Sequence, residues 1–350
     1  MAIRISYRSI FLFLAIIAGP FSLAKGAVFL VTNANDSGPG SLRQAVLDAN
    51  SAGGPDTIQW SGTGGTIASA SALPALTGVV TLDPSAATST PDILGDLNIG
   101  PGLVIAGAMI WDGVLSGAGS LSKTGANTIL TLTATNTYTG GTSATGQFYS
   151  IILISRDNNL GDPASTLALT TGGNLTLSAD MVSDRPMVLG GAGNGDIDTS
   201  IHSATFTGTM SGVGQFFKYG SGTLLLSGNI SITTGLGAFQ GSLILSGANT
   251  YGSFTVIGSN ATLGVYQDSN LGNSYIINQG GILRTLASTT ITKQYAPGSM
   301  GLLGSFDTNT SEEYFAQALA QNPGGRNENI YPDDSSLEPW RSKPNAKFGT

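Results

Sequence analysis

The sequence predicts an all-β fold, a right-handed parallel β-helix (β-solenoid) in which short strands stack coil upon coil. Three observations predict this fold. A motif of short apolar strands and glycine turns recurs at long spacing, glycine accounts for 50 of the 350 residues, and only 10% of the residues are charged. Stacked repeats of this kind build solenoids. Amphipathic helices normally carry far more Lys and Glu, so a helical bundle is disfavoured.

The recurring motif has an opening half and a closing half. The opening half, Gly-x-Gly-x-apolar-x-Lys-x-Gly, occurs at residues 117–125 and again at residues 212–220. The closing half, two alternating Leu residues followed by Asn-Thr-Tyr, occurs at residues 130–138 and is matched at residues 243–251, with a shorter copy at residues 223–228. Function must therefore be argued from a repetitive surface, because no conspicuous catalytic motif stands out.

Residues 1–24 are predicted to form a secretory signal peptide. Arg4 and Arg8 precede the apolar run 10–18, and the small-residue pattern Ser-Leu-Ala ends at Ala24, where we expect cleavage. The alternative is a membrane anchor, but the apolar run is roughly half of the ~20 residues that a spanning helix needs. The mature chain is therefore expected to contain no membrane-spanning segment.

Residues 25–56 are predicted to cap the N-terminal end of the solenoid. A short strand is expected at residues 28–32, and Ser41 with Gln44 forms the pattern of a capping box that opens a brief helix at residues 42–49. Gly53 and its neighbours end this helix. A helix laid across the first coil would cover a strand edge that is otherwise unpaired.

Residues 57–295 are predicted to form the β-helix itself. Leucines separated by two residues point to one side of a strand, while the Thr and Ser residues between them point to the other side. Lys123 and Lys218 share one position of the repeat, so we expect a structural role in which the stems pack and the ammonium groups face solvent. The leucine pairs are Leu130 and Leu132, Leu167 and Leu169, Leu175 and Leu177, Leu224 and Leu226, and Leu243 and Leu245.

Residues 296–350 are predicted to form a poorly ordered, charged tail with one short helix. Charges cluster here, from Asp307 to Lys347, in a stretch that is also rich in Pro, Asn and Ser. Thr310 and Glu313 form the pattern of a capping box, and residues 322–324, Asn-Pro-Gly, end the helix that it would open.

These motifs together resemble the autotransporter-associated β-strand repeat of passenger regions in bacterial surface and secreted proteins. The residues that carry the resemblance are 117–142, followed by the Asn-Leu-Gly turns at residues 159–161 and 270–272. Residues 31–50 are similar to the opening segment of extracellular parallel β-helix proteins. The resemblance implies a passenger scaffold. In this family a membrane β-barrel usually follows the repeat, and nothing after Gly301 has that pattern, so a chain lacking the C-terminal barrel is expected.

Asp196 and Asp198 are the candidate site residues. On a strand, two residues separated by two project to the same side, where repulsion could raise the pKa of one carboxyl for general acid work. Residues 190–198 are also similar to a calcium-binding repeat, although one extra residue separates Asn194 from Asp196 and there is no second tandem copy. Calcium is therefore the one metal ion that the sequence suggests. A glycine-rich turn without a ligand is the competing interpretation.

Other candidate chemistry is weak. His202 is the single His, and no Gly-x-Ser-x-Gly motif accompanies it, so a catalytic triad is disfavoured. The absence of Cys excludes disulfides and thiolate sites. Tyr138, Tyr251 and residues 148–149, Phe-Tyr, could stack on sugars if they were exposed, but we expect them to fill the core.

The function that these observations favour is a secreted or cell-surface passenger of a bacterium, a structural and adhesive scaffold for weak multivalent attachment. Glycans or other cell-surface molecules are the expected partners. The net charge of −7 argues against nucleic acid. The alternatives are an extracellular polysaccharide-degrading β-helix enzyme and a truncated, non-functional fragment. No enzymatic activity, and no cofactor other than calcium, is predicted.

Overall fold

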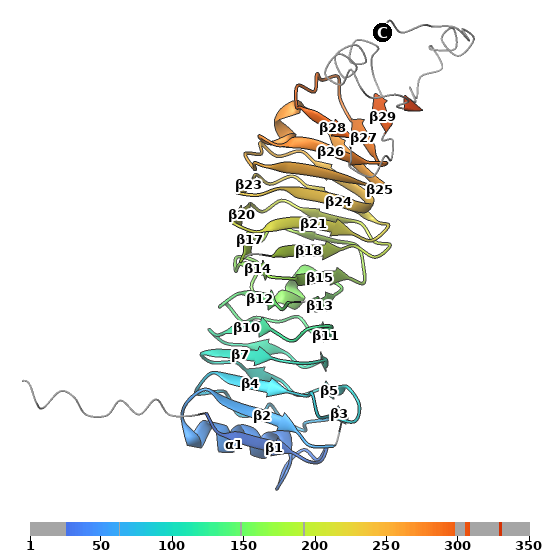
Figure 1. Cartoon of the computed structure of the whole chain (residues 1–350). Helices are drawn as coiled ribbons and strands as arrows, with labels where there is room; N and C mark the ends of the chain where they lie inside the picture. The colour runs from blue at the N-terminus through green and yellow to red at the C-terminus, as the bar shows by residue number, and fades with distance from the viewer. Residues whose placement is uncertain are drawn as a thin grey trace, which may run out of the picture.

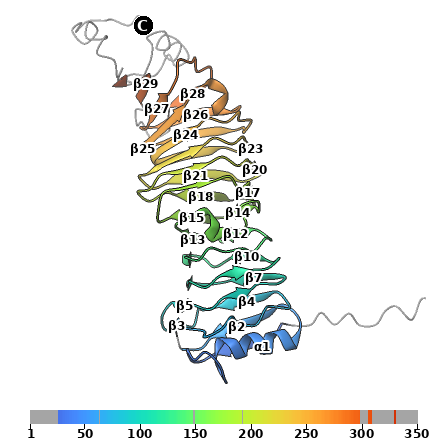
Figure 2. The ribbon, with the colours of Figure 1, turned by 180° about the vertical axis from the view of Figure 1, so that it is seen from behind.

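The computed structural model describes residues 26–297 apart from residues 63, 148 and 192, together with residues 305–308 and 329–330. This part of the chain is almost entirely strand and turn, wound into a long solenoid with one α-helix at its N-terminal end (Figure 1 and Figure 2). Each named strand pairs in parallel with strands of neighbouring coils, as between β1 and β2 or β11 and β13. The expected all-β parallel β-helix is thereby confirmed.

The strands form three parallel sheets, one on each face of the solenoid. Sheet 1 contains ten strands in sequence order. They are β1 (Val28–Val31), β2 (Asp56–Trp60), β4 (Val80–Asp83), β7 (Gly102–Ile105), β10 (Ser120–Lys123), β12 (Thr142–Thr145), β14 (Leu167–Thr170), β17 (Met187–Gly190), β20 (Met210–Gly212) and β23 (Ile230–Ile232).

Sheet 2 follows sheet 1 along each coil. Its strands are β3 (Gly65–Ile67), β5 (Pro91–Ile93), β8 (Met109–Trp111), β11 (Thr128–Leu132), β13 (Ser150–Ile154), β15 (Gly173–Leu177), β18 (Asn194–Asp198), β21 (Gln215–Tyr219), the first halves of β24 (Leu236–Leu245) and β25 (Phe254–Val265), β26 (Tyr275–Gln279) and β28 (Tyr295–Pro297).

Sheet 3 completes the coil and is interrupted. It begins with β6 (Leu97–Asn98) and β9 (Leu115–Ser116). It resumes with β16 (Met181–Ser183), β19 (Ala204–Phe206), β22 (Thr223–Leu226), the second halves of β24 and β25, β27 (Ile282–Thr285), β29 (Ser305–Thr308) and β30 (Asn329–Ile330). Because β24 and β25 run on through the corner, sheets 2 and 3 are continuous there.

The alternating leucines form the core, as the sequence predicts. In sheet 2, Leu130, Ile152, Leu175 and Ile197 occupy one position in successive coils, and all four are fully buried. The residues between them point to the outer face. Burial of each such column removes apolar surface from water at about 25 cal/mol per Å2, while the parallel ladders satisfy the backbone.

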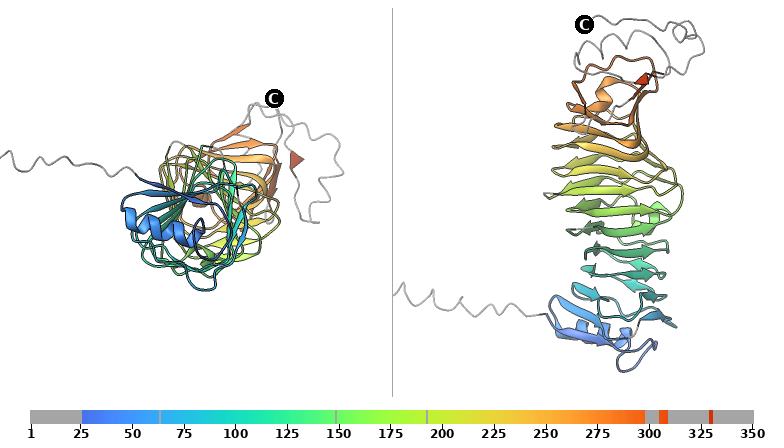
Figure 3. Two further views of the ribbon diagram at one scale, coloured as in Figure 1. Left: turned by 90° about the horizontal axis from the view of Figure 1, so that it is seen from below. Right: turned by 45° about the vertical axis from the view of Figure 1, so that its right-hand side comes forward.

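Helix α1 (Leu42–Ala52) closes the N-terminal end of this core. Ser41 is its N-cap, and its Oγ accepts a hydrogen bond from the Gln44 amide at 3.1 Å. The reciprocal bond of a capping box is replaced, because the Gln44 side chain donates to Asp48 instead. The helix buries Leu42, Ala45, Val46 and Ala49, and it lies across the end of the solenoid when the molecule is viewed from below (Figure 3). It therefore covers the first coil, as expected.

Two polar modules replace strands in the ladders. Module one joins residues 136–142 to the 3₁₀ turn η1 (Asp157–Leu160), and it lies on the sheet 3 side between β9 and β16. Module two joins residues 249–255 to η2 (Asp268–Leu271), and it lies on the sheet 1 side beyond β23. The closing half of the repeat has thus moved from one face of the solenoid to another.

The parallel ladder extends beyond residue 295, where the composition of the chain changes. Strand β28 pairs with β26, and β29 pairs with β27 across residues 305–308. Residues in the stretch that was expected to be a tail therefore continue the solenoid. The predicted signal peptide, residues 1–24, and the predicted helix that begins near residue 310 lie outside the described residues. The described part of the chain contains no helix long and apolar enough to span a bilayer.

Candidate functional site

The two repeat lysines have a different environment from the expected one. Their side chains are fully buried, so the prediction that the ammonium groups face solvent is wrong. Lys123 is on β10 in sheet 1, and Lys218 is on β21 in sheet 2. Burial lowers the pKa of both amines to about 8. The acceptors of Lys123 are the Thr124 carbonyl and Thr128 Oγ1, and those of Lys218 are the carbonyls of Gly220, Gly222 and Gln240. Each ammonium group thus bridges its acceptors at one corner of the solenoid and stabilises that corner.

The repeat tyrosines are core residues, as expected. Tyr138 and Tyr251 are fully buried, and burial raises the pKa of both phenols well above the usual range. Each hydroxyl reaches a threonine four residues later, Thr142 at 2.6 Å and Thr255 at 2.9 Å. Neither ring is available to a ligand. Of the other aromatic pair, Phe148 lies outside the described residues, and Tyr149 is 46% exposed, so the expectation that Tyr149 fills the core is wrong.

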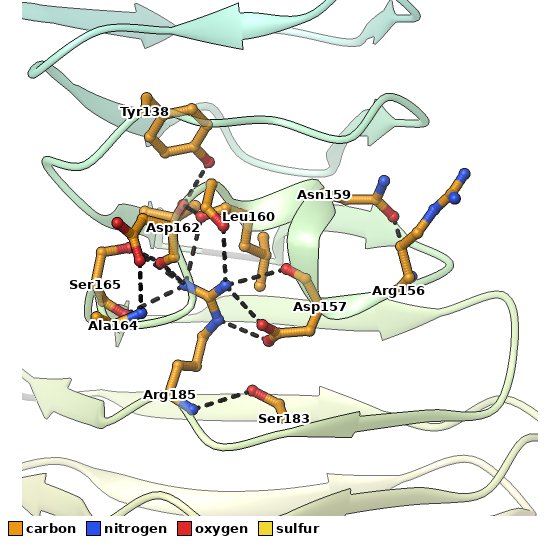
Figure 4. A network of polar contacts seen from close by, with 12 residues as sticks. Tyr138, Arg156, Asp157, Asn159, Leu160, Asp162, Ala164, Ser165, Ser183 and Arg185 are labelled. Atoms are coloured by element: carbon orange, nitrogen blue, oxygen red, sulfur yellow. Dashed lines mark hydrogen bonds and ion pairs between the residues drawn. The ribbon is translucent and has the colours of Figure 1, made fainter.

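The largest polar network surrounds Arg185 and is structural (Figure 4). Its guanidinium is fully buried and forms a bidentate ion pair with Asp157, at 2.8 Å from Nε and 3.0 Å from Nη2. The remaining hydrogen bonds go to the Ser165 hydroxyl and to carbonyl oxygens of residues 157, 160, 161, 162 and 165. All three guanidinium nitrogens are engaged, so the group holds the turn after η1 and leaves no donor for a ligand.

His202 has no catalytic surroundings. Its Nδ1 lies 3.6 Å from the Asp180 carboxylate, which is longer than a hydrogen bond, and the Asp180 side chain is 76% exposed. This pair is a loose surface contact.

Asp196 and Asp198 both lie on β18, and both point to the outer face of sheet 2, as the spacing predicted. Ile197 between them is in the core. Asp198 Oδ1 accepts the Ser200 amide hydrogen at 2.7 Å. Asp196 is fully buried, and its Oδ1 accepts a hydrogen bond from the Asn194 side chain at 2.5 Å. Its Oδ2 is buried without a partner among the described residues.

Burial raises the pKa of Asp196 to about 6, opposed by the hydrogen bond from Asn194. The spacing of the two carboxylates predicted such a shift from the repulsion between them. Desolvation is the cause instead, because the charged form of Asp196 loses the water that would stabilise it.

The strand register surrounds Asp196 with two kinds of side chain. The coils of β15 and β18 present a polar belt, defined by Asn174, Thr176, Asp196 and Asp198. The next coils present an aromatic ladder, defined by Phe217, Tyr219 and Phe239. Phe217 follows Asp196 in the register, and Tyr219 follows Asp198. On the other side of the belt, Ile151 and Leu153 precede Asn174 and Thr176.

The rings of the aromatic ladder pack against one another. Tyr219 and Phe239 are stacked, with centroids 5.4 Å apart and planes 12° apart, and Phe217 meets Phe239 edge to face at 5.1 Å. Gly237 leaves room for both rings, because a Cβ there would lie 3.1 Å from the Phe239 ring and 3.2 Å from the Phe217 ring, which is a tight contact. Burial raises the pKa of Tyr219, and the nearby Asp196 carboxylate and the Tyr149 side chain raise it further. The belt, the ladder and Tyr149 thus form one site.

Sequence reasoning missed the aromatic ladder, although a signal was present. Phe216 and Lys218 are inward repeat positions, so Phe217 and Tyr219 had to point outward by alternation. The equivalent residues of the first copy are Ser122 and Thr124, which are polar. Aromatic residues at the outward positions of one copy only are the signal that distinguishes this face.

Calcium binding at Asp196 and Asp198 stays a prediction. The calcium repeat uses carboxylates from stacked coils, but the neighbours of Asp196 in the adjacent coils are Asn174 and Phe217. Within the described residues, no group of three or more acidic or His side chains gathers to hold a metal ion. The belt offers two carboxylates from a single coil.

The fold defines the class of this chain: it is a parallel β-solenoid. In sequence, it is 38% identical over 138 residues to the adhesin BmaC autotransporter of Brucella suis biovar 1 (strain 1330). This match covers 39% of the chain and 4% of that much longer relative. No protein-family model and no solved structure matches the chain.

Proposed function

We propose that the chain is a secreted or surface-displayed passenger that acts as an adhesive scaffold. The observation that carries this proposal is the similarity to an autotransporter adhesin in a chain that folds as a parallel β-solenoid. The role is non-enzymatic. The buried ionisable groups Lys123, Lys218 and Arg185 are used within the fold, which favours a scaffold over a catalyst.

The outer surface of the solenoid suits weak contacts repeated along its length. A central outward row of sheet 1 runs from Thr57 through Ser122 to Ser231, and every member is Thr, Ser, Val or Ala. This row carries no charge and consists of small side chains, so it can lie close to another surface without desolvating charges. Because contacts on one rigid body act together, weak ones add to useful avidity.

Export and attachment are tested together in the native host. Cells are fractionated into cytoplasm, periplasm, outer membrane and medium with an antibody against the solenoid, and intact cells are labelled with the same antibody. A deletion strain, and the same strain carrying the gene again, are compared for attachment to host cells and to abiotic surfaces. We expect the protein on the cell surface or in the medium, and a several-fold loss of attachment on deletion that the restored gene repairs. Cytoplasmic retention, or unchanged attachment, would contradict the proposal.

A further inference from the structure

The outer face of sheet 2 has the layout of a small carbohydrate site. The polar belt is two coils wide, and coils repeat at about 4.8 Å, so the belt measures roughly 10 Å along the axis of the solenoid. Bulky apolar side chains border it on both sides, Ile151 and Leu153 on one and Phe217 and Tyr219 on the other. Thr176 and Asp198, the partly exposed members of the belt, lie between these apolar side chains and suit a sugar ring, which has hydroxyls at its edge and C–H groups on its faces.

Tyr219 provides the stacking surface. Phe239 comes from the following coil and packs on Tyr219 with nearly parallel planes. The opposite face of Tyr219 is therefore directed toward the coil of Asp198 and Thr176, whose side chains are small. The side chains of Tyr149 and Tyr219 also interact, and Tyr149 is 46% exposed. Aromatic faces carry partial negative charge and pack well against C–H groups.

Asp196 is the second, independent observation. Its side chain is fully buried, and its Oδ2 has no hydrogen-bond partner among the described residues. An acceptor left buried and unpaired is costly, and such groups in native proteins usually mark a ligand, an ion or a water. A hydroxyl is a donor of the right kind. Asp198, on the same strand, is only partly buried and can accept from a second hydroxyl.

We propose that the polar belt and the aromatic ladder bind a neutral oligosaccharide. One hexose or N-acetylhexosamine ring would lie against Tyr219, with its hydroxyls directed at Thr176 and Asp198, the partly exposed members of the belt, and with the buried Asp196 beside them. Charge decides the class of sugar: the belt carries carboxylates and no cationic side chain, so acidic polysaccharides are repelled. This inference rests on the proposed adhesive function and names the ligand class of its outer surface.

The experiment titrates the full chain with chitohexaose and with cellohexaose by isothermal calorimetry, and uses hexagalacturonate as the acidic control. We expect one of the neutral hexamers to bind with a Kd below about 1 mM and hexagalacturonate not to bind. Tyr219→Ala should weaken binding about tenfold, because it removes the stacking face. Asp198→Asn, which keeps the shape of the side chain, should weaken it a few-fold.

The matched control is Tyr275→Ala. Tyr275 is 42% exposed on β26 of the same sheet and lies outside the belt, so its loss should leave binding unchanged. Circular dichroism and thermal melting establish whether each variant is folded. If Tyr219→Ala does not fold, the affinity of Asp198→Asn for the hexamer decides the outcome. Neutral hexamers that fail to bind, hexagalacturonate that binds best, or a folded Tyr219→Ala with wild-type affinity would each overturn the inference.

The same variants separate this inference from the proposed function. If deletion of the gene abolishes attachment but a Tyr219→Ala strain attaches normally and its protein binds the hexamer normally, the sugar site is wrong and the adhesive role stands. If the purified protein binds the hexamer through Tyr219 but deletion leaves attachment unchanged, the site stands and the adhesive role is wrong.

Discussion

Modules one and two show how far this repeat determines its own structure. In each, an Asn amide bridges successive coils: Asn136 accepts from the Leu115 amide at 2.8 Å and donates to the Asn159 carbonyl at 2.6 Å. In module two, Asn249 accepts from Ile230 at 2.9 Å and donates to Asn270 at 2.7 Å. The two modules lie on different faces of the solenoid. The hydrogen bonds are therefore local, and the surrounding face does not determine them.

The modules differ in what lies behind the tyrosine. In module one the buried Arg185 pairs with Asp157 and binds the carbonyls of the turn. In module two the described contacts there are a chain of hydroxyls, from Thr255 to Ser274 at 2.6 Å and on to the Leu271 carbonyl at 2.9 Å. The same repeat motif thus accommodates either a buried ion pair or a chain of neutral hydroxyls behind its tyrosine. The difference teaches that the Asn and Tyr residues define the module, and that the group behind them is free to vary.

The largest effect is expected for Arg185→Ala. It leaves the Asp157 carboxylate without its partner and deprives several carbonyls of a donor, so we expect a loss of about 3–5 kcal/mol in the free energy of unfolding. The loss should concentrate in module one. Hydrogen exchange should show faster exchange around η1 and unchanged protection around η2. The control is Arg43→Ala, which breaks the ion pair with Asp36 and the hydrogen bonds to the Ser71 and Ala72 carbonyls near the N-terminal end, and should leave protection in both modules unchanged. Equal loss of protection in both modules would contradict the local picture.

Asn159→Ala and Asn270→Ala sharpen the comparison. Asn159 Oδ1 accepts from the amides of Ser155 and Arg156, and its Nδ2 donates to the carbonyls of Thr133 and Ala134. Asn270 accepts from two equivalent amides and donates to the Gly247 carbonyl. We expect each change to cost about 2–4 kcal/mol, by similar amounts, in urea unfolding. A cost confined to one module would show that the face, rather than the motif, determines the structure.

Asp196→Asn tests the region between the modules. The folded-state pKa of Asp196, about 6, lies above the ordinary value of 3.8 for an Asp carboxyl. Between these two pH values the folded state binds more protons than the unfolded state, so stability falls as the pH rises from about 4 to about 6. The Asn variant should lack this fall and be about 1–3 kcal/mol more stable than wild type at pH 7. Melting curves at pH 4 and pH 7 measure the difference. A wild-type protein with the same pH dependence as the variant would contradict the burial argument.

Calcium is expected to have the smallest effect. With two carboxylates from one coil, a site at Asp196 and Asp198 should bind calcium only with a Kd in the millimolar range. At 1 mM calcium the midpoint of melting should rise by about 1 °C or less relative to a chelator. Asp198→Asn is the comparison variant, and protection in both modules should be unchanged. A larger rise that Asp198→Asn abolishes would establish a true calcium site.

Local signals in the sequence predicted much of this fold, and contacts between distant coils account for the rest. Alternating leucines give the core, and the helix after Ser41 follows from its capping pattern. The sequence shows that the repeat recurs but not on which face, because turns and strands such as β24 vary in length. Arg185 meets Asp157 from 28 residues away, and no local pattern indicates that pairing.

Only part of the candidate site could be predicted from the sequence, for the same reason. The spacing of Asp196 and Asp198 predicted a shared outward side. Their surroundings depend on β15 and β21, which belong to the coils before and after. The burial of Asp196, and with it the cause of its raised pKa, could not be derived from one strand.

The bridging asparagines also have a mechanical meaning. A force that pulls one end of a solenoid along its axis loads the ladders one coil at a time, so the coils should peel off in small steps at nearly constant force. Asn136 joins three consecutive coils, since it binds Leu115 in the coil before and Asn159 in the coil after. Peeling should pause at this coil and again at Asn249, and the two pauses would divide an anchored chain under tension into segments that give way in order.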